Sequence, residues 1–211
     1  MPFGRGPRLS YASTPRAGSK AARHIGPLQT KSPDYRRPLA NAPRAPTGGI
    51  MVKNLILIRH GKAEPGSLDQ LDEERRLTHQ GLDALRAPTG FARGVSLMDD
   101  SEREHAQVWV SPAVRTHQTA QALLHVIGER PLVDKGCLWE QDSVAFLDEL
   151  EQSDAQTVIA VGHIPFMNDM VELLSGACIG FKPGAMAKLS LSDPLQPGCA
   201  DLSWFVQGPK A

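Results

Sequence analysis

The sequence feature that most constrains the fold is a short apolar run that ends at Arg59-His60-Gly61. Residues 54–58 read Asn-Leu-Ile-Leu-Ile, which is typical of a buried strand. Such a strand carries the arginine and the histidine to its carboxyl end, where open α/β sheets bind their ligands. Glycine after the histidine lets the backbone turn at once and leaves room for a ligand. The tripeptide is short, so its meaning depends on what the rest of the chain adds.

Strand-like and helix-like segments alternate along residues 51–211. We expect strands at 53–58, 107–110, 131–133, 157–161, 185–191 and 201–206. We expect helices from His79, capped by Thr78, to before Pro88, then over 111–127, 143–152 and 165–175. Ser111 is the expected N-cap of the second helix and Pro112 its first residue, whereas residues 88–105 look irregular. This alternation predicts a three-layer α/β/α domain with a mostly parallel central sheet.

Two further motifs follow predicted strands in the same way. Residues 111–116 read Ser-Pro-Ala-Val-Arg-Thr, and residues 162–165 read Gly-His-Ile-Pro. Because the carboxyl ends of parallel strands share one edge, these motifs should meet Arg59 and His60 there. Arginine matches two phosphoryl oxygens with a planar fork that stays charged, and the beginning of a helix favours anions. The sequence therefore predicts a phosphoryl-binding site at this edge.

With the Arg-Leu-Thr at 76–78 and Gly81, these motifs resemble the histidine phosphatase superfamily. The resemblance is to its small SixA-type phosphohistidine phosphatases in particular, and it covers residues 51–208. It implies a phosphoglycerate-mutase-like fold.

The resemblance also implies roles for four residues. His60 would be the nucleophile that forms a covalent phosphohistidine, which water hydrolyses in a second step. Arg59 and Arg115 would bind the phosphoryl oxygens, and His163 would bind them as a second imidazole. Ile164 departs from the family pattern, which usually has a polar residue at this position. No cofactor is expected, and no metal site either, because His60, Glu64 and His163 lack a metal-binding spacing.

The general acid is less clearly marked. Many superfamily members protonate the leaving oxygen with a Glu or Asp, and Glu140, after the third predicted strand, is the candidate. The alternative is a solvated loop residue. An alkoxide leaving group needs a proton, whereas imidazole leaves with little help. Our hypothesis is that the domain prefers phosphoramidates to phosphate esters.

The favoured function is a phosphatase that removes phosphate from phosphohistidine on a signalling or phosphocarrier protein. By resemblance, the expected substrates are phosphotransfer domains and related phosphocarriers. Two alternatives remain open: a phosphatase for a small phosphorylated metabolite, and a catalytically silent phosphate-binding module. A mutase is disfavoured, because this chain is too short for the cap that such a site needs.

Charge divides the chain into two parts. Residues 1–50 hold nine Lys/Arg, one acid and eight of the 17 prolines, which predicts a disordered basic tail. A translation start at Met51, a transit segment and a basic arm are its three interpretations. Residues 51–211 hold 14 basic and 22 acidic residues, a net charge of −8, which disfavours a nucleic acid partner.

Cysteine use and hydropathy suggest a location. The three cysteines show no CxxC spacing, which indicates a reducing compartment, the cytoplasm. No stretch approaches the roughly 18 apolar residues of a membrane span, so no membrane partner is expected.

Overall fold

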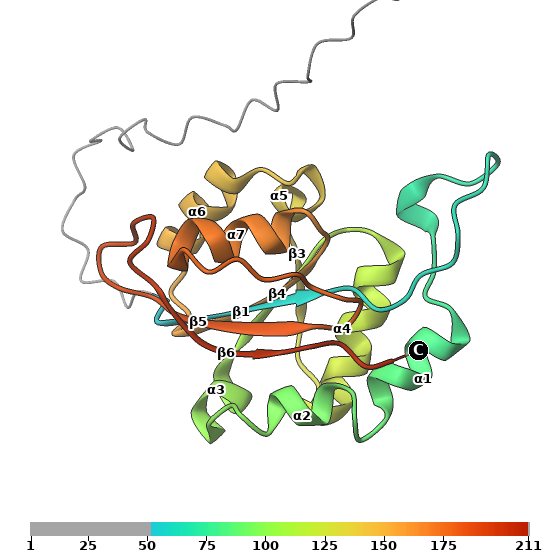
Figure 1. Ribbon diagram of the computed structural model, residues 1–211, viewed down its shortest axis with the longest axis horizontal. Helices are drawn as coiled ribbons and strands as arrows, with labels where there is room; N and C mark the ends of the chain where they lie inside the picture. The colour runs from blue at the N-terminus through green and yellow to red at the C-terminus, as the bar shows by residue number, and fades with distance from the viewer. Residues whose placement is uncertain (1–51, 211) are drawn as a thin grey trace, which may run out of the picture. The chain divides into compact units, whose positions relative to one another are not determined.

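The computed structural model describes residues 52–210, which form a six-stranded mixed sheet with helices on both faces (Figure 1). Strands β1 to β4 are parallel to one another, whereas β5 runs antiparallel to β1 and β6. Their order across the sheet is β3-β2-β4-β1-β5-β6. The strands are β1 (Asn54–Arg59), β2 (Gln107–Val110), β3 (Leu132–Asp134), β4 (Thr157–Gly162), β5 (Met186–Ser190) and β6 (Asp201–Val206).

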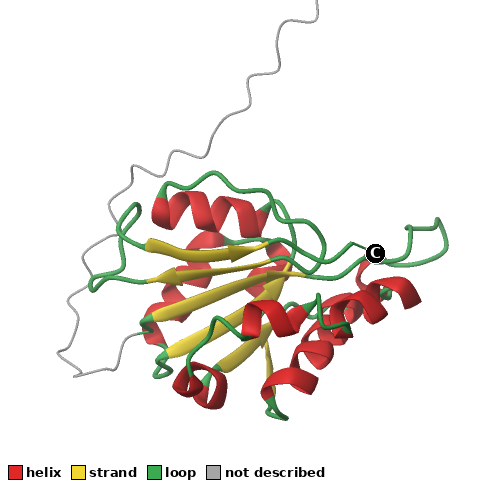
Figure 2. Cartoon of the chain, turned by 60° about the horizontal axis from the view of Figure 1, so that its bottom comes forward, coloured by secondary structure: helices red, strands yellow, loops and turns green. Residues whose placement is uncertain are grey.

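The helices form the two outer layers (Figure 2). One layer holds α1 (His79–Arg86), α2 (Phe91–Val95), α3 (Asp100–His105) and α4 (Val114–Ile127). The other holds α5 (Gly136–Glu140), α6 (Ser143–Gln152) and α7 (Phe166–Ser175). A 3-10 helix, η1 (Asp72–Glu74), lies in the long connection between β1 and α1. The predicted three-layer fold with a mostly parallel sheet is confirmed.

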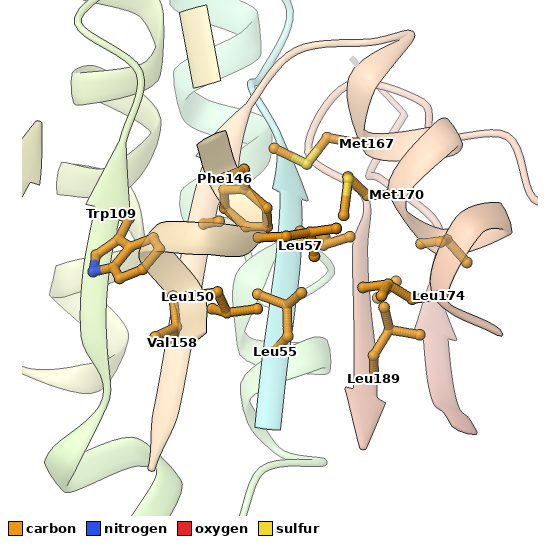
Figure 3. Packing of buried hydrophobic residues seen from close by; sticks show 14 of the residues in the cluster. Leu55, Leu57, Trp109, Phe146, Leu150, Val158, Met167, Met170, Leu174 and Leu189 are labelled. Atoms are coloured by element: carbon orange, nitrogen blue, oxygen red, sulfur yellow. The ribbon is translucent and has the colours of Figure 1, made fainter. Parts of the chain in front are cut away.

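Strand β1 explains why its sequence is apolar without a break. Leu55 and Leu57 point toward the α5–α7 layer and belong to one buried cluster with Phe146 and Met167; Figure 3 shows Leu57 between Phe146 and Met167. Ile56 and Ile58 point to the opposite face and join the core under α1, α2 and α4. These four side chains are fully buried, whereas the two end residues of the strand are partly exposed. A central strand covered on both faces cannot alternate with polar residues.

The expectation of an irregular segment at 88–105 was wrong, because the structure places α2 and α3 there. Asp99 and Glu102 form a capping box at the start of α3. The Asp99 carboxylate accepts from Glu102 N at 2.7 Å, and the Glu102 carboxylate accepts from Asp99 N at 3.1 Å. The Asp-x-x-Glu spacing carried this signal. By contrast, Thr78 caps α1 as predicted, its Oγ1 accepting from Gly81 N at 2.9 Å.

Two other local expectations need correction. Helix α4 begins at Val114 with Ala113 as N-cap, so Ser111 and Pro112 precede the helix rather than open it. The Ser111 hydroxyl is used instead in the candidate site. Helix α5, which carries Glu140, was not expected.

The remaining expectations concern the whole chain. The basic segment predicted at 1–50 lies outside the described residues. No helix between residues 52 and 210 is long and apolar enough to cross a membrane. All three cysteines are free thiols.

Candidate active site

Three motifs meet at the carboxyl edge of the sheet because their strands are adjacent and in register. Arg59 pairs with Gly162 across β1 and β4. The His60 N–H then donates to Gly162 O at 3.0 Å, and the Ser111 N–H donates to Val161 O at 3.0 Å. The backbone therefore brings the residues after β1, β2 and β4 to one place, as the sequence predicted.

His60 is held in one tautomer by its own turn. Its Nδ1 lies 2.7 Å from the carbonyl oxygen of Gly61. Since a carbonyl only accepts, Nδ1 carries the proton and Nε2 keeps its lone pair. Burial lowers the pKa of His60 to about 4, a fall opposed by the Gly61 hydrogen bond and deepened by nearby arginine charges. The ring is therefore neutral at pH 7 and nucleophilic at Nε2.

The turn at Gly61 is tied to helix α4. The Gly61 N–H donates to Thr119 Oγ1 at 3.0 Å, and the Thr119 hydroxyl donates to Arg115 O at 2.7 Å. A Cβ on Gly61 would come within 2.8 Å of Leu85 Cδ1. Glycine therefore lets the turn pack closely against α1 while α4 fixes its position.

His163 is buried beside His60, with ring centroids 5.2 Å apart. Its Nδ1 lies 3.4 Å from an Arg115 terminal nitrogen, and its Nε2 lies 2.8 Å from Ser111 Oγ. Because a guanidinium only donates, Nδ1 accepts and the ring proton on Nε2 goes to the serine. Burial lowers the pKa of His163 to about 3, and electrostatic interactions with His60 and then with Arg115 lower it further. His163 is thus a neutral ring that orients Arg115, and both of its nitrogens have partners.

The two predicted arginines are held differently. Arg59 donates from a terminal nitrogen to Phe181 O at 2.7 Å. Arg115 donates to the backbone oxygen and, at 2.7 Å, to the carboxylate of Asp72. In both side chains Nε is buried without a hydrogen-bond partner. Two unpaired N–H donors near one neutral histidine are suited to receiving an oxyanion.

Glu140 is not brought to this group. It is the last residue of α5, is exposed, and has no hydrogen bond or ion pair among the described residues. Its neighbour Trp139 is the residue that reaches the site. The Trp139 ring lies 5.4 Å from the His163 ring, and the Arg115 guanidinium carbon lies 5.5 Å from its centroid.

Sequence reasoning missed Asp72, Arg75, Trp139 and the side-chain role of Ser111. Asp72 and Arg75 stand in a charged stretch where several residues look alike, so no local signal distinguishes them. Trp139 directly precedes Glu140, the residue that the sequence analysis named as the candidate acid. Within residues 52–210 no group of three or more His, Cys, Asp or Glu side chains is placed to hold a metal ion.

Solved structures with this fold include several SixA proteins. The one from Nakamurella multipartitia, assigned as a phosphohistidine phosphatase, is 29% identical, with a TM-score of 0.58 over 75% of this chain and 97% of its own. The corresponding protein from Agrobacterium tumefaciens is 23% identical, with a TM-score of 0.60 over 74% and 97%. A protein histidine phosphatase SixA complexed with tungstate is 21% identical, with a TM-score of 0.57 over 73% and 96%.

More distant neighbours share the fold. A phosphoglycerate mutase from Bacillus anthracis is 13% identical, with a TM-score of 0.54 over 74% of this chain and 94% of its own. No protein-family model and no curated protein sequence matches the chain. The fold of the chain is therefore that of the histidine phosphatase superfamily, with SixA phosphohistidine phosphatases among its structural neighbours.

Proposed function

We propose that this protein is a phosphohistidine phosphatase that acts through a covalent intermediate on His60. The observation that carries the proposal is the state of that ring. Its proton is held on Nδ1 by Gly61 O, which leaves the lone pair on Nε2. The charges of Arg59 and Arg115, whose Nε donors are unpaired, act on the same ring. A neutral imidazole among fixed cations is what attack on a phosphoryl dianion requires.

The proposed reaction has two displacement steps. The Nε2 lone pair attacks phosphorus, and the bond between phosphorus and the substrate's ring nitrogen breaks. A substrate imidazole protonated at its other nitrogen leaves as a neutral ring. Water then attacks the phosphoryl group on His60, the N–P bond electrons return to Nε2, and phosphate leaves with the two protons of the water.

Arginine charges support both steps. Arg59, Arg115 and Arg75 all act electrostatically on His60, each lowering its pKa. The same positive field stabilises the oxygens of a phosphoryl group in transfer. One neighbour was solved in complex with tungstate, a tetrahedral oxyanion of similar charge to phosphate.

Among the described residues, the protonation states at the site favour phosphohistidine over phosphate esters. The hydrogen bond from Arg75, and then that from Arg115, lowers the pKa of Asp72, so this carboxyl is ionised at pH 7. His163 is neutral and Glu140 lies outside the group. None of these three groups is a carboxylic acid able to protonate an alkoxide, whereas an imidazole that is already protonated at its other nitrogen needs no proton from the site.

The substrate we propose is a phosphorylated histidine on another protein, a phosphotransfer domain or a phosphocarrier, in the cytoplasm. The domain is short, and we expect an open site that admits a protein surface. A small phosphorylated metabolite is the competing substrate, because a phosphoglycerate mutase shares the fold.

Hydrolysis by the full chain tests the proposal. Phosphate release from a phosphohistidine protein is compared with release from a panel of phosphomonoesters. We expect phosphohistidine to be favoured by orders of magnitude, with no release by His60→Ala. His117→Ala is the matched control, because His117 lies on α4 at the surface and bonds to Asp134 at 2.7 Å. Equal or faster turnover of a small ester would reassign the protein as a metabolite phosphatase. No turnover of either class would leave only phosphate binding.

A further inference from the structure

Asp72 accepts hydrogen bonds from Arg115, the arginine that would bind the phosphoryl group in the proposed reaction. It begins η1 in the connection that extends beyond the end of β1 (Figure 1), and we call residues 62–76 the β1–α1 loop. One Arg115 terminal nitrogen donates to the Asp72 backbone oxygen. The other donates to the Asp72 carboxylate at 2.7 Å. Both ends of the guanidinium fork are thus filled by one residue of the loop.

A carboxylate is a close stand-in for a phosphoryl group at an arginine. Both are anions that offer two oxygens to the planar fork. The Arg115 side chain is only 6% exposed, whereas that of Asp72 is 54% exposed. The arginine is therefore fixed in the protein, and the carboxylate is the partner able to leave for water.

We propose that Asp72 is an intramolecular competitor that a phosphoryl group must displace from Arg115, and that it thereby sets the affinity of the site for phosphate. This inference rests on the proposed function, since it assumes that Arg115 receives the phosphoryl group. The same competition favours product release, because the carboxylate returns to Arg115 as phosphate departs.

A second arginine makes the exchange easy. Arg75 donates to the other Asp72 carboxylate oxygen at 2.7 Å. Arg75 is itself held by Glu64 O, at 3.0 Å from Nε and 2.6 Å from a terminal nitrogen. Asp72 therefore keeps one cationic partner after it leaves Arg115, and the loop need not unfold.

The base of the loop is fixed while the exchange occurs. Ala63 and Leu77 form an antiparallel bridge, and the Leu77 N–H donates to Gln118 Oε1 on α4 at 2.7 Å. No residue of η1 is buried. A short displacement of the segment around Asp72 is thus enough to open the fork of Arg115.

The opposite role for Asp72 is to position Arg115 for binding, and the two roles predict opposite signs. If Asp72 competes, its neutralisation strengthens phosphate binding. If Asp72 positions the arginine, the same change weakens binding. The measurement is the dissociation constant of inorganic phosphate for the full chain, by calorimetry, with the product-inhibition constant as a kinetic counterpart.

We expect Asp72→Asn and Asp72→Ala each to bind phosphate about three- to tenfold more tightly, the size expected for loss of a partly exposed charge pair. Glu73→Gln is the matched control, since it removes the same charge from the adjacent exposed residue, which has no described partner. Glu73→Gln should leave the constant unchanged. Thermal unfolding of each variant verifies that the fold is retained.

Each other outcome overturns a specific statement. If wild type binds phosphate but both Asp72 variants bind it equally or more weakly, the competitor role is wrong and the proposed function stands. If Glu73→Gln strengthens binding as much, the effect is general charge and not Asp72. If neither wild type nor any variant binds phosphate, the proposed function fails along with the inference.

Discussion

His163 and Asp72 both contact the guanidinium of Arg115, yet they belong to two very different regions. His163 follows β4, a strand whose six residues are all buried, and its own exposure is 5%. Asp72 lies in the β1–α1 loop, where Leu68 is 105% exposed and Leu71 is 62% exposed. One contact is fixed by the sheet, and the other is made by a segment that buries little surface.

The two contacts of Arg115 suit two different roles, rigid positioning and reversible binding. Groups that must hold a reacting atom within a fraction of an ångström lie on rigid elements, because packing locks their positions. Segments with few buried contacts open at low free-energy cost, so they suit contacts that must exchange. We therefore expect substitutions at the sheet edge to abolish chemistry and substitutions in the loop to adjust binding.

The largest expected effect is loss of the proposed nucleophile. His60→Ala should reduce turnover of phosphohistidine by at least about a thousandfold, because the proposed mechanism forms its covalent intermediate on this ring. An acid-labile phosphoryl-enzyme, trapped by rapid quench in wild type, should be absent from the variant. A trapped intermediate that survives in His60→Ala would place the nucleophile elsewhere.

The second expected effect is the loss of kcat/KM on removal of an arginine, which we compare for Arg115 at the sheet edge and Arg75 in the loop. Arg115→Ala should lower kcat/KM on the order of a hundred- to a thousandfold, since it removes a buried cation from the developing charge. Arg75→Ala, in the loop, should lower it only about two- to fivefold, because that side chain is partly exposed. Steady-state kinetics of both variants measure the ratio. Equal losses would mean that the loop is as much a part of the catalytic machinery as the sheet edge.

The third expected effect is a pH dependence of the free energy of unfolding, caused by His60 and His163 at the edge of the sheet. The pKa values of His60 and His163 fall from 6.5 to about 4 and about 3. Between those values and 6.5 the unfolded chain binds more protons than the folded one. The free energy of unfolding should therefore rise with pH from about 3 to 6.5 and then level off. Chemical denaturation across this range measures the slope.

The variant that tests the cause of this slope is His163→Gln, which removes one of the two buried rings. Its unfolding free energy should rise less steeply with pH over the same window, whereas substitution of exposed His125 should leave the slope unchanged. An unaltered slope in His163→Gln would show that other groups cause the acid sensitivity.

The smallest expected effect is at Glu140. Glu140→Gln should change phosphohistidine turnover by less than about twofold, because this exposed carboxylate contacts none of the site residues and imidazole needs no acid. Initial rates on a phosphohistidine protein test this. A loss of most activity would contradict the idea that the site works without a general acid.

Local signals predicted the elements that carry the site. The apolar run before Arg59 and the run before Gly162 each identified a central strand, because only a strand covered on both faces is apolar throughout. The parallel-strand rule then brought His60, Arg115 and His163 to one edge. The short helices α2, α3 and α5 were not predicted, since five or six residues show too little periodicity to be recognised.

Side-chain pairing was beyond local reasoning. Ser111 precedes Pro112 and so looked like a helix cap, but its hydroxyl bonds to His163, 52 positions away in the chain. Asp72 and Glu73 are both exposed acids of one short helix, and only the former meets Arg115. Such choices depend on where distant elements pack, which no local pattern records.

By itself, the sequence determined the three-layer fold and the edge of the sheet where the histidines and arginines gather. It did so because burial on two faces and the direction of parallel strands both leave marks in the order of residues. Only the tertiary structure decided that Trp139 rather than Glu140 reaches the site, and that Asp72 contacts Arg115. Those contacts depend on how elements that are far apart in the chain pack against one another.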